Sequence, residues 1–256
     1  MAIYSLKKSY QLRNLKEVKF KDLWGDHGVF TTMWIYGCPP KILFFKEHIK
    51  NLIKSAKLYK ISKLSINSDI SKILKKNLNI KKNYNHLLRV ALNKNTLSVS
   101  LRKRIKPSLN FNLKLVNLKR QKPEFKNLKY KKILKHLSKL DNSKSDIGLC
   151  SKNKIFETGT SNILFIKDAK VFSPINKFYK GVTYKFFTSK ISRIIKKDIL
   201  VNSLKEFDEI ILIGSGKGVA SVKTIKQIKW KRKSLKFYNL FFKNFKLAIN
   251  RCPKYK

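Results

Sequence analysis

Residues 155–165 place a single carboxylate between two apolar segments of the chain. They read IFETGTSNILF, so Glu157 follows an apolar pair and precedes a small polar turn, after which a hydrophobic strand begins at Ile163. Only 14 of the 256 residues are acidic, against 60 basic ones, so a carboxylate in this setting needs an explanation. The plainest is a turn carboxylate that accepts local backbone N–H groups; the alternative is a functional residue.

Apolar runs that alternate with turn residues predict a mixed α/β (α+β) fold without internal repeats. The predicted strands are 28–37, 41–45, 86–92, 96–102, 110–118, 146–150, 154–156, 162–166, 170–173 and 209–213. The predicted helices are 45–60, 68–78, 126–140, 182–197 and a C-terminal amphipathic helix with Phe241, Phe245 and Ile249 on the core. The polar stretch 119–124 is the predicted linker between a smaller N-terminal α+β domain (1–118) and a larger C-terminal domain (125–256).

The formal charge of +46 points first to a nucleic-acid partner. Only eight of the 60 basic residues are arginine, however, and the lysines are spread over the whole length. No module that presents arginine forks or amides to base edges is visible. A/T-rich codons for Lys, Asn and Ile explain the composition, so we expect no specific nucleic-acid partner. The alternative, a basic nucleic-acid-binding protein on a decayed enzyme fold, predicts salt-sensitive binding and a colourless preparation.

Cysteine, histidine and hydropathy patterns narrow the class further. Cys38, Cys150 and Cys252 form no CxxC pair, which favours a reduced, cytoplasmic setting. The four histidines are too scattered to predict a metal site. Long uncharged apolar runs are absent from the sequence, so we expect no membrane span.

Four segments, taken in order, resemble the fold-type IV pyridoxal-phosphate enzymes. They are KPEFKNLKY (122–130), IFETGTSNILF (155–165), KGVTYKF (180–186) and LIGSGKGVASV (212–222). That family contains branched-chain and D-amino-acid aminotransferases and 4-amino-4-deoxychorismate lyase. The resemblance extends from about residue 22 to about residue 225. It implies two domains with pyridoxal 5'-phosphate between them, and a homodimer.

The resemblance also assigns roles to residues. Lys126, in a Lys-x-Leu pattern typical of the lyase and D-amino-acid branches, would bond to the cofactor aldehyde and carry the substrate proton. Glu157, in a Glu-x-x-x-x-Asn turn, would keep the pyridine nitrogen protonated. The backbone N–H groups of Val182 and Thr183, with the hydroxyls of Thr183 and Ser215, would bind the phosphate. An N-cap that binds nothing is the competing interpretation of the segment 180–183.

The same comparison predicts the substrate pocket and shows where this chain departs from the family. Phe30, Thr32, Gly214 and Gly216 would line the pocket. Thr158 stands where the family usually has glycine, and Lys129 stands where the lyase pattern has asparagine. Asn51 takes the place of the phosphate-binding arginine, so that either another cation neutralises the phosphate or the cofactor is held less tightly.

The expected function is aminodeoxychorismate lyase, which converts 4-amino-4-deoxychorismate to 4-aminobenzoate and pyruvate for folate synthesis. Three observations favour it: Phe30-Thr31-Thr32, the Lys126-x-Leu128 pattern and the short chain. The alternative is an aminotransferase, first of all for branched-chain amino acids, which would use the same Lys126 and Glu157 but need a 2-oxoacid acceptor.

Overall fold

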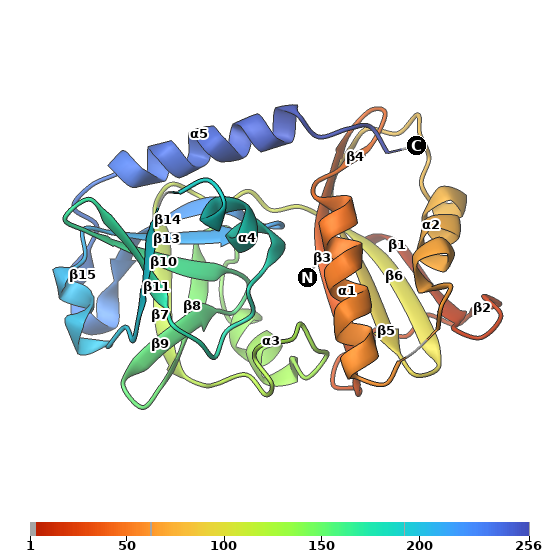
Figure 1. Cartoon of the computed structure of the whole chain (residues 1–256), viewed down its shortest axis with the longest axis horizontal. Helices are drawn as coiled ribbons and strands as arrows, with labels where there is room; N and C mark the ends of the chain where they lie inside the picture. Colours follow the sequence, from red (N-terminus) through yellow and green to blue (C-terminus); the bar gives the residue numbers. More distant parts are fainter. Residues whose placement is uncertain (1–3, 62, 192, 256) are drawn as a thin grey trace. The chain divides into compact units, whose positions relative to one another are not determined.

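The computed structural model describes residues 4–61, 63–191 and 193–255 (Figure 1). The chain divides into two compact units. Unit 1 comprises Met1–Arg104, Phe125–Tyr130 and Arg251–Lys256, and unit 2 comprises Ile105–Glu124 and Lys131–Asn250. This division differs from the predicted boundaries at 118 and 124. The segment 105–124 belongs to unit 2, whereas 125–130 returns to unit 1.

Unit 1 is built on a six-stranded antiparallel sheet of order β2-β1-β6-β5-β3-β4. Its strands are β1 (Tyr4–Gln11), β2 (Glu17–Val18), β3 (Gly28–Gly37), β4 (Lys41–Ile42), β5 (Tyr84–Asn93) and β6 (Thr96–Lys103). Its helices are α1 (Phe45–Leu58) and α2 (Ile66–Asn77). The predicted helices 45–60 and 68–78 are confirmed to within two residues.

Strand β3 shows why this sheet has two chemically different faces. Successive strand residues point to opposite sides. Val29, Met33 and Ile35 therefore join the main core of unit 1, to which α1 and α2 contribute apolar side chains. Phe30 and Thr32 lie on the other face, where Phe30 enters a small separate cluster. Phe30 and Thr32 therefore lie on the face opposite the main core of unit 1.

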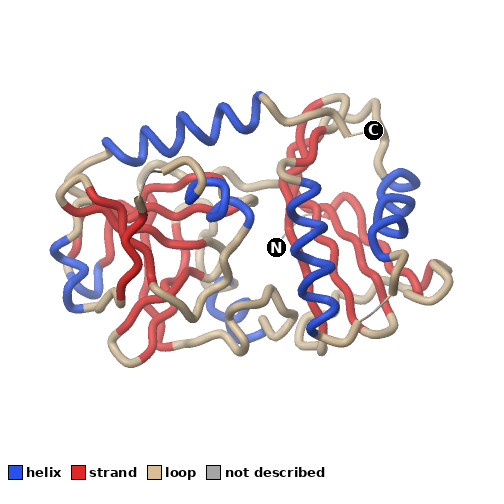
Figure 2. Tube along the Cα trace, viewed as in Figure 1, coloured by secondary structure: helices blue, strands red, loops and turns tan. Residues whose placement is uncertain are grey.

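Unit 2 is built on a nine-stranded mixed sheet of order β12-β11-β10-β13-β14-β7-β8-β9, with β15 paired to β14. Figure 2 draws the strands of the chain in red. Its strands are β7 (Phe111–Asn117), β8 (Ser145–Ser151), β9 (Lys154–Thr158), β10 (Asn162–Lys167), β11 (Lys170–Pro174), β12 (Ile194–Lys197), β13 (Glu209–Gly214), β14 (Gly218–Ile225) and β15 (Trp230–Lys231). Its α-helices are α3 (Lys131–Leu137), α4 (Val182–Thr188) and α5 (Lys236–Asn250), and two 3-10 turns are η1 (Asn202–Glu206) and η2 (Lys226–Ile228).

Two predicted helices are wrong in extent. The helix expected over 126–140 is confined to α3, because residues 126–130 run alongside β3 instead. The backbone N–H of Phe30 donates to the Lys126 carbonyl at 2.9 Å, and that of Leu128 donates to the Gly28 carbonyl at 2.9 Å. The helix expected over 182–197 ends at Thr188, and 194–197 form β12, parallel to β11. Residue 192 of that prediction lies outside the described residues.

Other predictions differ in detail. Strand 41–45 is reduced to β4, and the sequence did not predict β1 or β14, each of which is a long strand of its sheet. In α5, Phe241 and Phe245 are buried as predicted, while Ile249 is only half-buried.

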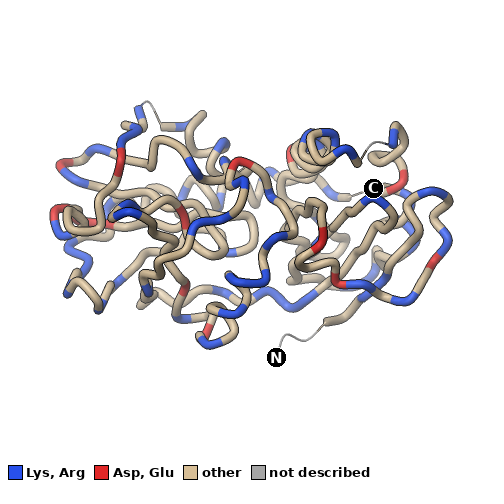
Figure 3. The backbone as a smooth tube through the Cα atoms, turned by 90° about the horizontal axis from the view of Figure 1, so that it is seen from below, with Lys and Arg blue, Asp and Glu red and all other residues tan. Residues whose placement is uncertain are grey.

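Among the described residues no helix is long and apolar enough to cross a membrane. Lysine and arginine occur along the whole backbone (Figure 3).

The close approach of β3 to β5 provides a test of the fold. A β-carbon at Gly28 would lie 2.2 Å from the Leu92 carbonyl oxygen and 2.7 Å from Leu128 Cδ1. Since the carbonyl belongs to a paired strand and cannot move freely, we expect Gly28→Ala to lower the free energy of unfolding by about 1–3 kcal/mol. Urea denaturation followed by circular dichroism measures it.

A matched control is Gly148→Ala in unit 2. There the three atoms nearest to the new β-carbon are side-chain carbons, at 3.0 Å for Leu115, 3.1 Å for Ile155 and 3.3 Å for Leu113. Such side-chain ends can yield by a few tenths of an ångström, so we expect a smaller loss. Equal unfolding midpoints for Gly28→Ala and the wild type would contradict the described strand pairing.

Candidate active site

Glu157 is buried in unit 2 and faces a buried cation. The Nε of Arg120 donates to Glu157 Oε1 at 2.7 Å, and its Nη2 donates to Oε2 at 3.2 Å. The side chain of Glu157 is 8% exposed, and that of Arg120 is 2% exposed. Arg120 also donates to the carbonyl of Pro123, and the backbone N–H of Tyr179 lies 3.4 Å from Glu157 Oε2. Arg120 thus compensates the buried negative charge.

This pairing is compatible with a role for Glu157 towards a further group. Each oxygen of a carboxylate can accept more than one N–H donor. The guanidinium therefore need not be displaced when a ligand with an N–H donor, such as a protonated ring nitrogen, approaches the same carboxylate. Because Arg120 is 37 residues away in the sequence, Glu157 has a distant side-chain partner in addition to a backbone N–H group.

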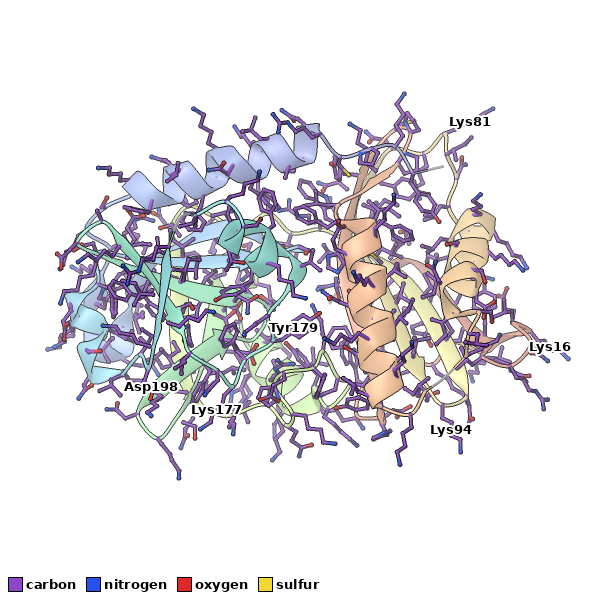
Figure 4. The ribbon with its side chains drawn as sticks, viewed as in Figure 1. Lys16, Lys81, Lys94, Lys177, Tyr179 and Asp198 are labelled. Carbon is purple, nitrogen blue, oxygen red and sulfur yellow. The ribbon has the colours of Figure 1, made fainter. Side chains whose placement is uncertain are left out.

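The loop that leads into α4 is held by Asn162, the residue that closes the Glu157 turn. Asn162 Nδ2 donates to the carbonyl of Tyr179 at 2.6 Å, and its Oδ1 accepts the backbone N–H of Gly181 at 3.2 Å. Tyr179 is labelled in Figure 4. A β-carbon at Gly181 would lie 2.9 Å from Asn162 Oδ1, so glycine suits this close approach. Asn162 therefore fixes the point at which α4 begins.

Two hydroxyls meet at the start of α4. Thr183 Oγ1 lies 2.9 Å from Ser215 Oγ, and both residues are buried. Ser215 comes from the turn between β13 and β14, next to Gly214, whose β-carbon would lie 3.1 Å from Ser161 Oγ. The first N–H groups of a helix, here those of Val182 and Thr183, have no acceptor within the helix. Such N–H groups with nearby hydroxyls suit an anion such as phosphate.

Lys126 belongs to unit 1 and differs from the lysines around it. It is half-buried, and its Nζ lies 5.2 Å from the centroid of the Phe30 ring. Lys122, Lys129 and Lys131 are exposed, and Lys129 donates to the carbonyl of Gly25 at 2.7 Å. Of the four lysines that are neighbours in this segment of the sequence, Lys126 is thus the one that is half-buried.

Aromatic rings accompany Lys126 on the same side of the unit 1 sheet. Three rings contact one another: the ring centroids of Trp24 and Phe30 are 4.7 Å apart, those of Phe30 and Tyr130 are 5.5 Å apart, and those of Trp24 and Tyr130 are 5.6 Å apart. The guanidinium of Arg89 lies 4.4 Å from the Trp24 ring centroid, and Arg89 pairs with Thr32 across β3 and β5. Phe30 and Thr32, two predicted pocket residues, therefore lie on one strand face with a group of rings and a cation.

His48 is a buried histidine that influences this region from α1. Its Nδ1 lies 2.7 Å from Thr31 Oγ1. Burial lowers the pKa of His48 to about 3, and the positive charge of Lys126 contributes in the same direction. The imidazole is therefore neutral at ordinary pH. Asn51, one helical turn further along α1, is half-buried, whereas the adjacent Lys50 is exposed.

Each unit thus brings together part of the predicted set. In unit 2, Thr183 and Ser215 meet, and Gly214 and Gly216 belong to the turn that carries Ser215. Unit 1 holds Lys126, Phe30 and Thr32. The sequence did not single out Arg120 or identify a role for His48. Arg120 could have been noticed as one of eight arginines in a lysine-rich chain, six residues before Lys126.

Comparison with known proteins identifies the family. The sequence matches the amino-transferase class IV family over residues 28–225, which is more than half of the chain. The protein therefore belongs to the class IV aminotransferases, a family of pyridoxal-phosphate-dependent enzymes. No curated protein matches the sequence.

Several solved structures share the fold. A branched-chain amino acid aminotransferase from T.th., complexed with N-(5'-phosphopyridoxyl)-L-glutamate, has a TM-score of 0.75 and 14% identity, over 97% of this chain and 96% of its own. The branched-chain aminotransferase of Thermoproteus uzoniensis has a TM-score of 0.74 and 13% identity, over 95% and 93%. A Legionella pneumophila protein named "Putative 4-amino-4-deoxychorismate lyase" has a TM-score of 0.68 and 17% identity, over 84% and 89%. At these identities the similarity concerns the fold.

The residues present are chemically suited to pyridoxal phosphate. Unit 2 offers a buried carboxylate with a compensating cation, and it also offers two buried hydroxyls beside a helix start that has no room for a side chain at position 181. Unit 1 offers a half-buried amine beside aromatic rings. An acceptor for a ring N–H, donors for a phosphate and an amine for an aldehyde are what this cofactor needs.

The buried His48 predicts a specific pH dependence of stability. The unfolded chain protonates this histidine near its ordinary pKa of 6.5, whereas the folded chain resists protonation down to about 3. The free energy of unfolding should therefore fall by up to about 1.4 kcal/mol per pH unit as the pH drops through this window. The variant His48→Asn has no imidazole to titrate at this position. The difference between its free energy of unfolding and that of the wild type should therefore shrink by about 2 kcal/mol between pH 7 and pH 5.

Urea unfolding curves at pH 7, 6 and 5 measure this difference. His136→Asn, at an exposed position on α3, serves as the control and should run parallel to the wild type across the same pH range. A constant difference between His48→Asn and the wild type at all three pH values would contradict the neutral, buried imidazole.

Proposed function

We propose that this class IV enzyme is an aminodeoxychorismate lyase, which releases pyruvate from 4-amino-4-deoxychorismate and leaves 4-aminobenzoate for folate synthesis. The observation that carries the proposal is the setting of Lys126. This lysine is half-buried beside the Phe30 ring, in the Lys-x-Leu segment that runs along the strand bearing Phe30-Thr31-Thr32. Those are the two patterns in which the chain resembles the lyase branch.

Bound pyridoxal phosphate supplies an aldehyde that bonds to amines and a ring that withdraws electrons from the carbon bearing the substrate nitrogen. Lys126 would hold the cofactor through its aldehyde, and its amine would carry the proton of the substrate carbon that bears the nitrogen. Removal of that proton would allow the bond between the substrate ring and the enolpyruvyl oxygen to break, and the released enolpyruvate would take up a proton at its methylene carbon to become pyruvate.

Glu157 would hold the proton on the ring nitrogen, and Arg120 would hold Glu157 in place. The ion pair is already formed, with 2.7 Å between Nε and Oε1, so no reorganisation of Glu157 is needed. Val182 and Thr183 would donate backbone N–H groups to the phosphate, and the Thr183–Ser215 hydroxyl pair would add side-chain donors. Phe30, Thr32, Gly214 and Gly216 would line the substrate pocket.

A second candidate function is an aminotransferase for branched-chain amino acids. It is favoured by the TM-scores of 0.75 and 0.74 with two branched-chain aminotransferases, against 0.68 with the lyase-named protein. Lys126 and Glu157 would keep the same roles, and the amino group would pass to 2-oxoglutarate. We further propose a cytoplasmic homodimer, an inference that draws on the family and on three cysteines free of disulfides.

The role of Lys126 is tested by spectroscopy of the purified protein. The wild type with pyridoxal phosphate should be yellow, and borohydride should fix the cofactor covalently on a peptide that contains residue 126. Lys126→Ala should lose both the visible band and the fixed label. Lys129→Ala, in which an exposed neighbour is removed, should keep both. A label on any other lysine would refute the assignment.

The choice of reaction is tested with separate substrates. For the lyase we expect release of pyruvate and 4-aminobenzoate from 4-amino-4-deoxychorismate without any added oxoacid, measured by a coupled pyruvate assay. Turnover of leucine that depends on 2-oxoglutarate, without pyruvate release, would overturn the lyase in favour of the aminotransferase. Heat-inactivated enzyme controls for spontaneous breakdown of the substrate.

A further inference from the structure

Asp146 is a buried carboxylate to which the proposed function gives no role. It lies on β8 and is fully buried. Its Oδ2 accepts hydrogen bonds from the hydroxyls of Thr158 and Thr160 at 2.9 and 2.6 Å, and lies 2.9 Å from Nζ of Lys217. Its Oδ1 accepts the backbone N–H of Ile147 at 2.8 Å. One carboxylate therefore joins side chains from two separate turns of unit 2.

Lys217 is the cation of this group and is itself almost fully buried. Its side chain is 9% exposed, and its Nζ lies 4.1 Å from the centroid of the Phe111 ring. Burial lowers the pKa of Lys217, while the charge of Asp146 acts in the opposite direction. A desolvated ammonium is costly without an ion partner, so the Asp146 carboxylate and the Lys217 ammonium depend on each other.

The two turns that this pair connects are those that carry the proposed cofactor ligands. Thr158 follows Glu157 as the last residue of β9, and Thr160 lies in the turn between β9 and β10. Lys217 belongs to the turn between β13 and β14, two residues after Ser215. Because β10 and β13 are antiparallel neighbours, the first residues of β10 lie beside the last residues of β13.

We propose that the Asp146–Lys217 pair is a positioning device that fixes the Glu157 turn relative to the Ser215 turn. Glu157 would bind the ring nitrogen and Ser215 the phosphate of the same cofactor molecule, so their separation must match a rigid ring. The inference rests on the proposed function of these two residues. It also gives Thr158 a purpose, since glycine at that position would have no hydroxyl to donate to Asp146.

A double-mutant cycle separates positioning from stability. Asp146→Asn and Lys217→Met each leave one buried charge without its partner, so both single variants should unfold more easily than the wild type. The double variant removes both charges and should be more stable than either single variant. It nevertheless lacks the Nζ donor that connects the turns. We expect it to bind pyridoxal phosphate about tenfold more weakly than the wild type.

Two measurements on the cofactor-free proteins read these effects. Urea unfolding gives the stability of each variant, and titration with pyridoxal phosphate, followed by the visible band, gives the dissociation constant. The matched control is Glu209→Gln. Glu209 is as deeply buried in unit 2, but its oxygens accept the backbone N–H groups of Phe237 and Tyr238 at the start of α5, both at 2.9 Å. This variant should lose stability and keep the dissociation constant of the wild type.

The outcomes are distinct. A larger dissociation constant in the double variant, together with an unchanged one in Glu209→Gln, supports a positioning role for the Asp146–Lys217 pair. A double variant that binds as tightly as the wild type overturns the inference and leaves the proposed function standing. Equal weakening in Glu209→Gln also overturns it, because the effect would then follow stability. Failure of the wild type itself to bind pyridoxal phosphate overturns the proposed function and this inference together.

Discussion

The ion pair between Arg120 and Glu157 is the constraint on which the arrangement in unit 2 most depends. Both side chains are almost fully buried, and removal of one partner from such a pair generally costs about 3–5 kcal/mol. The segment 105–124 packs into unit 2 because β7 pairs with β14 and β8 and places Phe111 and Leu113 in the core, and the Arg120–Glu157 pair adds a buried link at its end. The carboxylate can serve a ligand while its charge remains compensated.

Around this pair, unit 2 uses short polar links to hold turns whose positions the sheet alone does not determine. Asn162 ties the loop before α4 to β10, the hydroxyls of Thr183 and Ser215 meet, and Asp146 connects two further turns through Lys217. Each link buries polar atoms that are satisfied by one another, which favours one arrangement over its alternatives. A rigid cofactor with a phosphate at one end and a ring nitrogen at the other benefits from such preorganisation.

In unit 1 the corresponding constraint is the alternation of side chains along β3. It sends Thr31 towards His48 and the helices, and Phe30 towards Trp24 and Tyr130. A shift of register by one residue would exchange these two environments. The backbone hydrogen bonds between residues 126–128 and β3 then bring the amine of Lys126 to the Phe30 side.

The sequence alone determined the strands with strong apolar alternation, the helices α1 and α2, and the family, because periodicity and short motifs are local properties. It identified Glu157 from its unusual setting but not its partner. The tertiary structure decided what depends on distant residues. Residues 126–130 run along a strand instead of forming a helix, 194–197 add to a sheet, Arg120 is buried, and the side chain of Lys217 is only 9% exposed. Charge pairing and strand pairing join residues that are far apart in the chain, and local sequence patterns do not predict which distant residue will be the partner.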